Sequence, residues 1–376
     1  MQCVLLTLFL AATSASAQTQ TNQQKAQQYY ADANAAWKRG DSAAAIENFT
    51  QAINLFPNVA ELYYNRGTVY LAQSKYDLAV KDFDRAVEIR PSFFEAFDNR
   101  GIAYVRLGYS NLAIRDHTKA IEINPKAFGA YVNRGNAYRA TGEFDSAIKD
   151  FDKALEINPV LAEAYSSRGS AYQEKGDYTK AIEDLNKSIS LNPADWRAYN
   201  NRGNTYVLMK MYDTAIADFN KSIEISPQAE SFYNRAHVYS TKRNHEQAIK
   251  DYTEAIKLKP SFAGAYSNRG MSYQGKGNID LALRDFIKAV SLDEKEGIYY
   301  FNRANIYSFK GNLALAIADF TKAIEIYPLW AEAYRRRAKT YAKQGNTKAA
   351  TADLKKAEEV EKAKFNPAGK TSLILN

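Results

Sequence analysis

The chain has 376 residues, 46% of them hydrophobic, with 18 glycines, 9 prolines and one cysteine. This apolar content excludes a wholly disordered chain. The 50 basic and 42 acidic residues leave a net charge of +8 without a block of like charge, which excludes a nucleic-acid-binding tail. Three histidines and one cysteine argue against a dedicated metal site and a disulfide framework.

Residues 1–17 have the pattern of a secretory signal peptide. An apolar run at 4–12 precedes an Ala-Ser-Ala cleavage pattern at 15–17. The run is too short to span a bilayer. We therefore expect residues 1–17 to be removed and the protein to be exported, either periplasmic or secreted, with no thiol left because Cys3 is lost. The alternative is an uncleaved, buried N-terminal helix.

Prolines mark a tandem repeat along most of the chain. Their steps are 34 residues, with one step of 33 and one position taken by Glu294, and they fall at Pro57, Pro91, Pro125, Pro159, Pro193, Pro227, Pro260 and Pro328. Such regularity indicates an array of one supersecondary unit. With Ala26 as position 1, ten repeats occupy 26–364, after a short linker at 18–25 and before a C-terminal tail at 365–376.

Each repeat is predicted to be an antiparallel helix pair. In the fourth repeat, small and apolar residues follow helical spacing on two segments, at Tyr131, Gly135 and Tyr138 and then at Ala147, Phe151, Ala154 and Leu155. Residues 141–143 separate the helices. Position 20 is alanine in all ten repeats: Ala45, Ala79, Ala113, Ala147, Ala181, Ala215, Ala248, Ala282, Ala316 and Ala350. We expect an all-α fold in which neighbouring repeats bury each other's rings.

This pattern resembles the tetratricopeptide repeat. The shared signature is an aromatic residue at positions 4 and 24, a small residue at 8, tyrosine at 11, alanine at 20 and 27, and proline at 32. The departures are Ala36 at position 11, Glu294 and Lys362 at position 32, and His117, Leu185 and Leu354 at position 24. The resemblance implies a right-handed α-solenoid, a superhelix of helix pairs whose concave face is built mainly from the first helices.

Arginine at position 7 and aspartate at position 23 recur together in repeats two to ten. The residues are Arg66 and Asp82, Arg100 and Asp116, Arg134 and Asp150, Arg168 and Asp184, Arg202 and Asp218, Arg235 and Asp251, Arg269 and Asp285, Arg303 and Asp319, and Arg337 and Asp353. Because position 7 adjoins the packing face, an unpartnered guanidinium there would be costly. We predict structural ion pairs, within or between repeats; the alternative is that these residues face water.

A row of asparagines marks a candidate peptide-binding surface. Position 6 supplies Asn65, Asn99, Asn133, Asn201, Asn234, Asn268 and Asn302, and position 9 adds Asn136, Asn204 and Asn305. An amide both donates and accepts, so it can hold a peptide backbone of any sequence. The resemblance implies that position 6 faces the groove. The alternative is that these amides bond to a neighbouring helix backbone and stabilise the array.

Residues at other groove positions limit the kinds of partner segment that the groove is expected to bind. The resemblance implies a lysine at position 5 where relatives bind a C-terminal carboxylate, and no repeat here has one. Met271, Val207, Leu208, Phe301 and Phe309 predict an apolar inner surface in the later repeats, suited to a helix or hydrophobic segment. The protein's own apolar stretch at 372–375 is an alternative occupant.

Enzyme chemistry finds no support in the sequence. It contains no glycine-rich phosphate loop and no Ser, His and Asp constellation outside the repeats. His117 replaces a core ring, and His237 and His245 fall on different helices without a third ligand. Evenly spread basic residues and the export signal disfavour an RNA reader. We expect no cofactor, no nucleic acid and no membrane insertion after signal cleavage.

The sequence therefore predicts an exported, non-enzymatic scaffold or adaptor that binds an extended peptide or helix of another protein. The alternative is a non-catalytic substrate-recruiting or regulatory subunit of an exported enzyme or envelope assembly complex. A homo-oligomer is left open. The atypical first repeat and the charged C-terminal helix are expected to cap the array.

Overall fold

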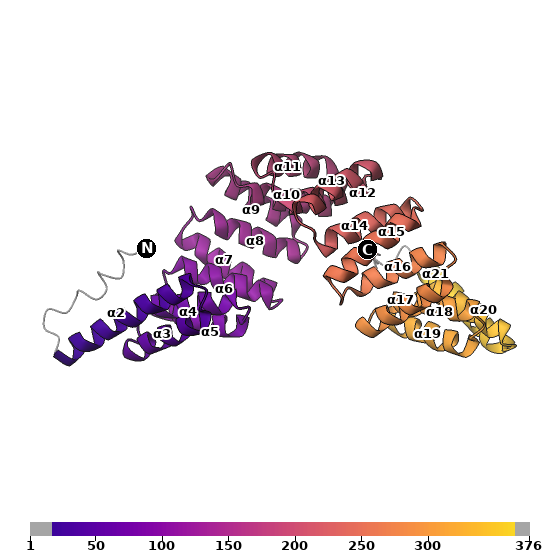
Figure 1. The fold of residues 1–376 in the computed structure, drawn as a ribbon, viewed down its shortest axis with the longest axis horizontal. Coiled ribbons are helices and arrows are strands. Elements are labelled where there is room, and N and C mark those ends of the chain that lie inside the picture. The colour runs from indigo at the N-terminus through magenta and orange to yellow at the C-terminus, as the bar shows by residue number, and fades with distance from the viewer. Residues whose placement is uncertain (1–16, 365–376) are drawn as a thin grey trace. The chain divides into compact units, whose positions relative to one another are not determined.

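The computed structural model describes residues 17–364, and these form α-helices connected by short turns, with no strand in that range. The predicted signal peptide before Ala17 and the C-terminal tail at 365–376, with its apolar stretch at 372–375, lie outside the described residues, as does Cys3. The chain divides into two compact units, residues 1–193 and 194–376. Figure 1 shows the helices of each unit.

The described part of the first unit contains ten helices. They are α2 (Ala17–Lys38), α3 (Ser42–Leu55), α4 (Ala60–Ala72), α5 (Tyr76–Ile89), α6 (Phe94–Arg106), α7 (Ser110–Ile123), α8 (Phe128–Ala140), α9 (Phe144–Ile157), α10 (Ala162–Lys175) and α11 (Tyr178–Leu191). The predicted linker at 18–25 is helical and continuous with α2, which makes α2 the longest helix of this unit.

Ten helices also make up the described part of the second unit. They are α12 (Trp196–Leu208), α13 (Tyr212–Ile225), α14 (Ala229–Thr241), α15 (His245–Leu258), α16 (Ala263–Gly275), α17 (Ile279–Leu292), α18 (Gly297–Phe309), α19 (Leu313–Ile326), α20 (Ala331–Lys343) and α21 (Thr347–Lys364). Lys362 stands where most repeats have proline, and α21 continues through it.

The helices stack as pairs within each unit. An even-numbered helix, called here a first helix, packs against the odd-numbered second helix that follows it, and that second helix packs against the next first helix. First helices also contact each other directly, as α4, α6, α8 and α10 do in one unit and α12, α14, α16, α18 and α20 in the other. Consecutive first helices therefore present a shared surface, which we call the first-helix face (Figure 1).

The turn inside each pair requires a left-handed residue at position 15. Seven repeats have glycine there, for example Gly142 with φ of 82°. Three repeats have another residue in the same conformation: Ser74, Lys210 and Arg243, with φ of 59° to 60°. Because a side chain disfavours this backbone region, those three turns are strained relative to the glycine turns.

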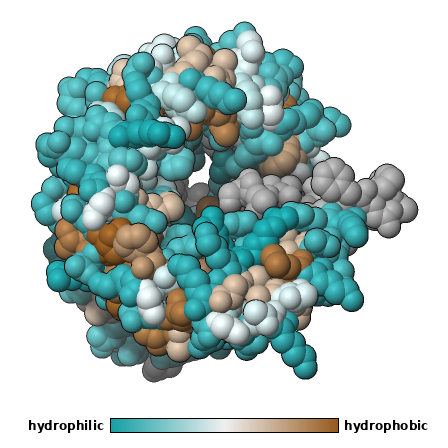
Figure 2. Space-filling view, turned by 90° about the vertical axis from the view of Figure 1, so that its right-hand side faces the viewer, coloured by the Kyte–Doolittle hydropathy of each residue, from teal (hydrophilic) through white to brown (hydrophobic). Residues whose placement is uncertain are grey.

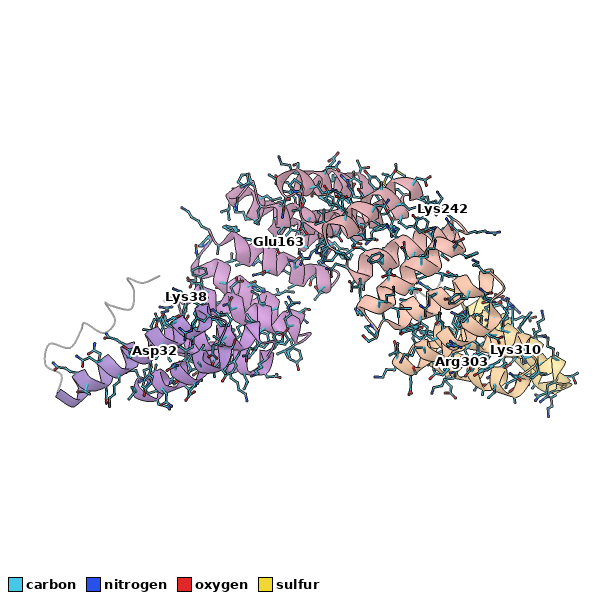
Figure 3. The ribbon with its side chains drawn as sticks, in the orientation of Figure 1. Asp32, Lys38, Glu163, Lys242, Arg303 and Lys310 are labelled. Carbon is cyan, nitrogen blue, oxygen red and sulfur yellow. The ribbon has the colours of Figure 1, made fainter. Side chains whose placement is uncertain are left out.

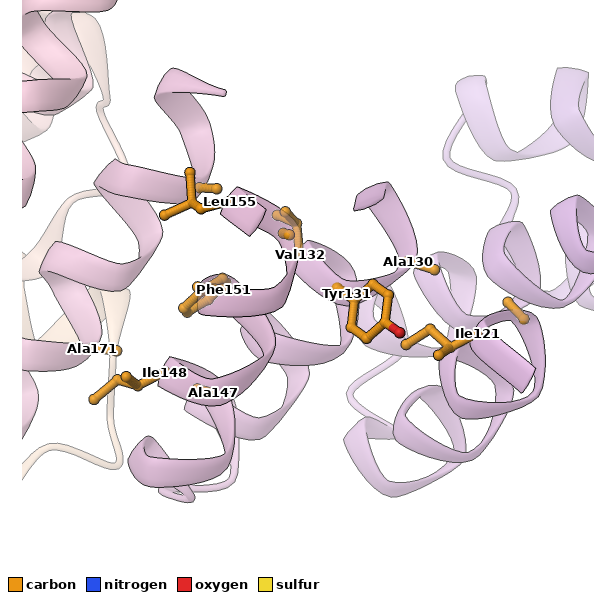
Figure 4. Close-up of a cluster of buried hydrophobic side chains, with 12 residues drawn as sticks. Ile121, Ala130, Tyr131, Val132, Ala147, Ile148, Phe151, Leu155 and Ala171 are labelled. Carbon is orange, nitrogen blue, oxygen red and sulfur yellow. The ribbon is translucent and has the colours of Figure 1, made fainter. Parts of the chain in front are cut away.

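Packing of a ring on a glycine joins the two helices of a repeat. In the fourth repeat the ring is that of Phe151, part of the buried cluster shown in Figure 4. Phe151 of α9 is fully buried, and its ring lies so close to Gly135 of α8 that a Cβ there would be 2.7 Å from Phe151 Cε1. Ala147 and Leu155 flank the ring on the same second helix, and Tyr131 packs from the first helix in the same buried cluster. The signature positions 8, 20 and 24 are therefore core positions.

Candidate functional site on the first-helix face

Nine arginine–aspartate pairs join the two helices of repeats two to ten. Each guanidinium donates from Nε and Nη2 to the two carboxylate oxygens of the aspartate 16 residues later, and the shortest N–O distance in each pair is 2.6 to 2.8 Å. The pairs are Arg66–Asp82, Arg100–Asp116, Arg134–Asp150, Arg168–Asp184, Arg202–Asp218, Arg235–Asp251, Arg269–Asp285, Arg303–Asp319 and Arg337–Asp353. Figure 3 labels Arg303.

These pairs are shielded from water. The Asp150 side chain is 8% exposed and that of Arg134 is 16% exposed. Hydrogen bonds from Arg134 to Asp150 raise the pKa of the guanidinium above its usual value, against the opposing effect of burial. Arg134 also lies between the rings of Tyr131 and Tyr138, with its Cζ about 5.8 and 5.9 Å from their centroids. Such bidentate, partly buried ion pairs fix the register of the two helices.

Seven of these arginines also donate a hydrogen bond to the preceding repeat, a contact that the sequence pattern did not predict. Nη1 of Arg134 donates to Thr118 Oγ1 at 3.0 Å, and Nη1 of Arg100 donates to Asp84 Oδ1 at 2.7 Å. The other acceptors within either unit are Thr50, Asp152, Asn220, Thr253 and Thr321. All stand at position 25. The sequence pattern that could have revealed the contact is a hydrogen-bond acceptor at that position in most repeats, although the residue type changes. Ile287, at position 25 behind Arg303, offers no acceptor.

Most position-6 asparagines bond to the preceding first helix. The amide nitrogen of Asn268 donates to Tyr233 Oη at 2.9 Å, and that of Asn234 to Asn200 Oδ1 at 3.1 Å. Asn65, Asn99, Asn133 and Asn302 make the corresponding bonds to Tyr30, Tyr64, Asp98 and Ser267, all at position 5. Asn201 lies on α12 and is half-buried. In each of these six amides, one N–H therefore bonds to the neighbouring helix, as the alternative to peptide binding predicted. The acceptors are side chains rather than backbone carbonyls.

The position-9 asparagines differ among themselves. Asn305 donates to the Phe301 carbonyl oxygen, one turn back on α18, at 2.9 Å. Asn136 and Asn204 are half-buried, and no hydrogen bond of either is found among the described residues. These two amides therefore present donors and acceptors that the scaffold does not use.

His117 occupies the ring position of its repeat, as predicted. The side chain is fully buried, and its Nδ1 lies 2.6 Å from Oδ1 of Asp98 on α6. The same carboxylate accepts from Asn133 of the next repeat, at 3.2 Å to each oxygen. Asp98 at position 5 is thus held by His117 of its own repeat and by Asn133 of the next repeat.

A cavity lies on the first-helix face of the second unit. Its volume is about 340 Å³, and α16, α18, α19 and α20 contribute its lining: Gln274, Asn305, Ser308, Phe309, Phe320, Arg336, Lys339 and Lys343. Arg336 occupies position 6, where most repeats have asparagine. The cavity combines amides, cations and an aromatic ring, which suits a polypeptide segment with mixed chemistry.

Exposed apolar side chains on the first helices are few and separate. Phe309 is 73% exposed, Leu208 is 49% exposed and Met271 is 43% exposed. Phe301 differs from the predicted inner surface, because its ring packs against Phe320 and Trp330 with centroid distances of 5.6 and 4.3 Å. The face drawn in Figure 2 is mostly hydrophilic, with small groups of hydrophobic residues between polar ones.

The described helices carry neither a group of metal ligands nor a membrane span. Within residues 17–364, no three His, Cys, Asp or Glu side chains are grouped as metal ligands would be. His237 and His245 belong to α14 and α15, as expected from their positions. The helices of that range include none with the length and apolar character needed to cross a bilayer.

Family models match almost the whole repeat array. Those described as tetratricopeptide repeat match residues 30–92, 94–126, 196–228, 229–262, 263–296, 298–328 and 331–364, and one described as TPR repeat matches 135–176 and 169–210. A search of curated proteins finds no match.

Solved structures share the architecture. A tetratricopeptide repeat protein from Parabacteroides merdae is 24% identical, with 66% of this chain and 99% of that chain aligned at a TM-score of 0.59. The MamA protein is 31% identical over 46% of this chain and 94% of that one, with a TM-score of 0.40. YrrB, described as a TPR protein with an unusual peptide-binding site, is 26% identical over 49% and 95%, with a TM-score of 0.41. The chain belongs to the tetratricopeptide repeat family.

Proposed function

We propose that this protein is a non-enzymatic scaffold or adaptor whose first-helix face binds an extended peptide or a helix of another protein. The observation that supports the proposal is a difference between two sets of polar side chains, those inside the helix pairs and those on the first-helix face. The arginine–aspartate pairs use their hydrogen-bonding capacity inside the array, whereas Asn136 and Asn204 keep theirs on the first-helix face. An unused amide on the first-helix face of either unit, Asn136 on α8 or Asn204 on α12, can satisfy a peptide backbone.

The apolar residues of the same face support the proposal. Leu208, Met271 and Phe309 are exposed on three different first helices of the second unit. Separate apolar anchors surrounded by polar groups are typical of surfaces that bind a segment of another protein. A partner's side chains would bury these anchors while its backbone meets the amides.

A second candidate function differs in the partner's role. In that case the protein recruits substrates for, or regulates, an exported enzyme or an envelope assembly complex. The signal-peptide pattern of residues 1–17 favours this setting. N-terminal sequencing of the mature protein from fractionated cells tests export: we expect the chain to begin at Gln18 outside the cytoplasm, and a cytoplasmic chain beginning at residue 1 would contradict it.

The binding proposal is tested in two steps. Cross-linking in the native compartment followed by mass spectrometry identifies partners, and the affinity of a purified partner is then measured for the chain and its variants. We test Asn136→Ala, in the first unit, and Asn204→Ala, in the second unit, as separate variants. The variant in the unit that holds the partner should weaken binding about threefold to tenfold, because the backbone loses one hydrogen-bonding partner. The melting temperature should hardly change, since no described residue bonds to either amide.

The control variant is Asn111→Ala. Asn111 is exposed on the second helix α7, away from the first-helix face. It should leave the affinity unchanged. Equal weakening by Asn111→Ala, or an unchanged affinity in both the Asn136 and the Asn204 variants, would show that the first-helix asparagines do not hold the partner.

A further inference from the structure

We infer that the cavity on the first-helix face of the second unit binds an acidic segment of a partner protein that also carries an apolar side chain. This inference rests on the proposed function and specifies the chemistry of the partner. It starts from the cations of α20. Arg336, Lys339 and Lys343 line the cavity and follow the spacing i, i+3 and i+7, which places them on one face of that helix.

Two of these cations are not neutralised by neighbours. Arg336 Nε lies 2.6 Å from Glu332 Oε1, four residues back. No carboxylate among the described residues is within ion-pair distance of Lys339 or Lys343, and both are exposed. By contrast, Lys310 at the neighbouring turn lies 2.5 Å from Asp280 (Figure 3). A ligand that brings carboxylates would supply the missing partners for Lys339 and Lys343.

The apolar half of the cavity comes from α18. Phe309 lines it and is 73% exposed, so most of its ring contacts solvent in the absence of a ligand. Covering that ring would remove apolar area from water, a favourable term that an ionic contact does not provide. An apolar side chain next to acidic residues therefore fits the cavity better than an acidic stretch alone.

Two side-chain amides in the lining of the cavity suit a polypeptide backbone. Gln274 on α16 and Asn305 on α18 line the cavity with side-chain amides. The Asn305 amide nitrogen bonds to the Phe301 carbonyl oxygen, which leaves its Oδ1 as an acceptor for a backbone N–H. Met271 at position 9 of the same helix as Gln274 extends the apolar surface.

A protein segment explains these features better than a nucleic acid does. Strands of nucleic acid are held by basic grooves that follow the phosphate backbone over several nucleotides. Here the cations belong to one helix, one of them is paired with Glu332, and the adjacent first helix presents Asn305 and Phe309. Local positive charge beside a single ring matches a short acidic and apolar sequence.

The test uses the full chain and pools of fluorescently labelled peptides twelve residues long. One pool contains Glu and Asp with leucine or phenylalanine at fixed positions. In a second pool Gln and Asn replace the acids, and in a third pool serine replaces the apolar residues. We expect the first pool to bind at least fivefold more tightly than either other pool at low ionic strength, with the charge preference reduced by salt.

Matched variants locate the binding. Lys339→Gln with Lys343→Gln should weaken the acidic pool about fivefold to tenfold, and Phe309→Ser should remove the preference for the apolar residue. The controls are Lys348→Gln with Lys355→Gln, exposed lysines of α21, and Leu315→Ser, an exposed leucine of α19. All of these positions are exposed, so circular dichroism should show the same unfolding for every variant.

Four results would overturn the inference. Equal binding of the neutral pool would reject the acidic specificity while leaving the proposed protein-binding function intact. Binding of the acidic pool that persists in the Lys339 and Lys343 variant, or tighter binding of a labelled twelve-nucleotide oligothymidylate, would reject this cavity as its site. No binding by any pool, whatever its charge, would reject both the inference and peptide capture by this face.

Discussion

Two regions of each repeat differ in how far their residues recur along the chain. One is the interior seam, where the arginine–aspartate pair joins the two helices, and the other is the first-helix face. In α8 and α20, the position-7 residues Arg134 and Arg337 form the same bidentate pair with an aspartate 16 residues later, at 2.7 Å. One residue earlier the two helices differ: Asn133 bonds to Asp98 of the preceding repeat, whereas Arg336 bonds to Glu332 of its own helix. Position 7 in the interior thus keeps one residue type, whereas position 6 on the first-helix face changes from asparagine to arginine.

This contrast separates stability from recognition within one helix. A half-buried ion pair is costly to break because the remaining charge is stranded. An exposed side chain on the first-helix face can change with little effect on stability. Substitutions in the seam should therefore lower the free energy of unfolding, and substitutions on the face should alter binding.

Removing one member of a seam pair is expected to have the largest effect. Arg134→Ala or Asp150→Ala should each lower the free energy of unfolding by roughly 3 to 5 kcal/mol. The double variant should cost much less than the sum, because neither charge is then left without its partner. Chemical denaturation of the four proteins completes the cycle. Additive losses would show that Arg134 and Asp150 do not act together.

Filling the glycine beneath a ring is expected to have the next largest effect. Gly135→Ala would place a methyl group 2.7 Å from Phe151 Cε1, and the overpacking should cost about 1 to 3 kcal/mol. Gly129→Ala is the control on the same helix, because no atom lies within 4 Å of the added methyl. Removing that helical glycine should stabilise the protein by roughly 0.5 to 1 kcal/mol. Equal effects of the two alanines would contradict this account of position 8.

The link between repeats should respond to the acceptor at position 25. Thr253→Ile removes the acceptor of Arg269 Nη1, whereas Ile287→Thr supplies one to Arg303. We expect a loss in the first case and a gain in the second, each about 1 kcal/mol. Denaturation midpoints measured on both variants provide the comparison. If the two changes shift stability in the same direction, the inter-repeat hydrogen bond is not the cause.

The smallest expected effect is in the turns. Lys210 adopts the left-handed conformation that Gly142 adopts in another repeat. Lys210→Gly should therefore raise the free energy of unfolding by roughly 0.5 to 1 kcal/mol, and Gly142→Ala should lower it by a similar amount. Thermal unfolding followed by circular dichroism can resolve both. A glycine at 210 that destabilises the protein would show that the conformational penalty is outweighed.

Local patterns along the sequence predict most of the fold but only part of the candidate site. The 34-residue period, the alanines at position 20 and the rings at position 24 predict helix pairs because each feature acts within one repeat. The arginine contact to the preceding repeat escapes such reading, since its acceptor is Thr118 in one repeat and Asp84 in another. No single residue type marks that position.

Side-chain direction limited the prediction of the face itself. Phe301 shares an apolar character with Phe309, yet it packs on Trp330 while Phe309 is mostly exposed. The position-6 asparagines lie on the first helices, but the choice between ligand and neighbour depends on where each amide points. For Asn268 one N–H goes to Tyr233, and for Asn136 no described residue takes it.

The two-way hydrogen bonding of the position-7 arginine makes the array tolerant of length changes at the junction between repeats and intolerant of them inside a repeat. Arg134 bonds to Asp150, 16 residues later in the same repeat, and to Thr118, 16 residues earlier across the junction. Where the chain is one residue shorter, the backward reach from Arg235 to Asn220 spans 15 residues and the forward reach to Asp251 still spans 16. Insertions and deletions should therefore accumulate in the connections after a second helix, so that such proteins diversify by gaining or losing whole repeats.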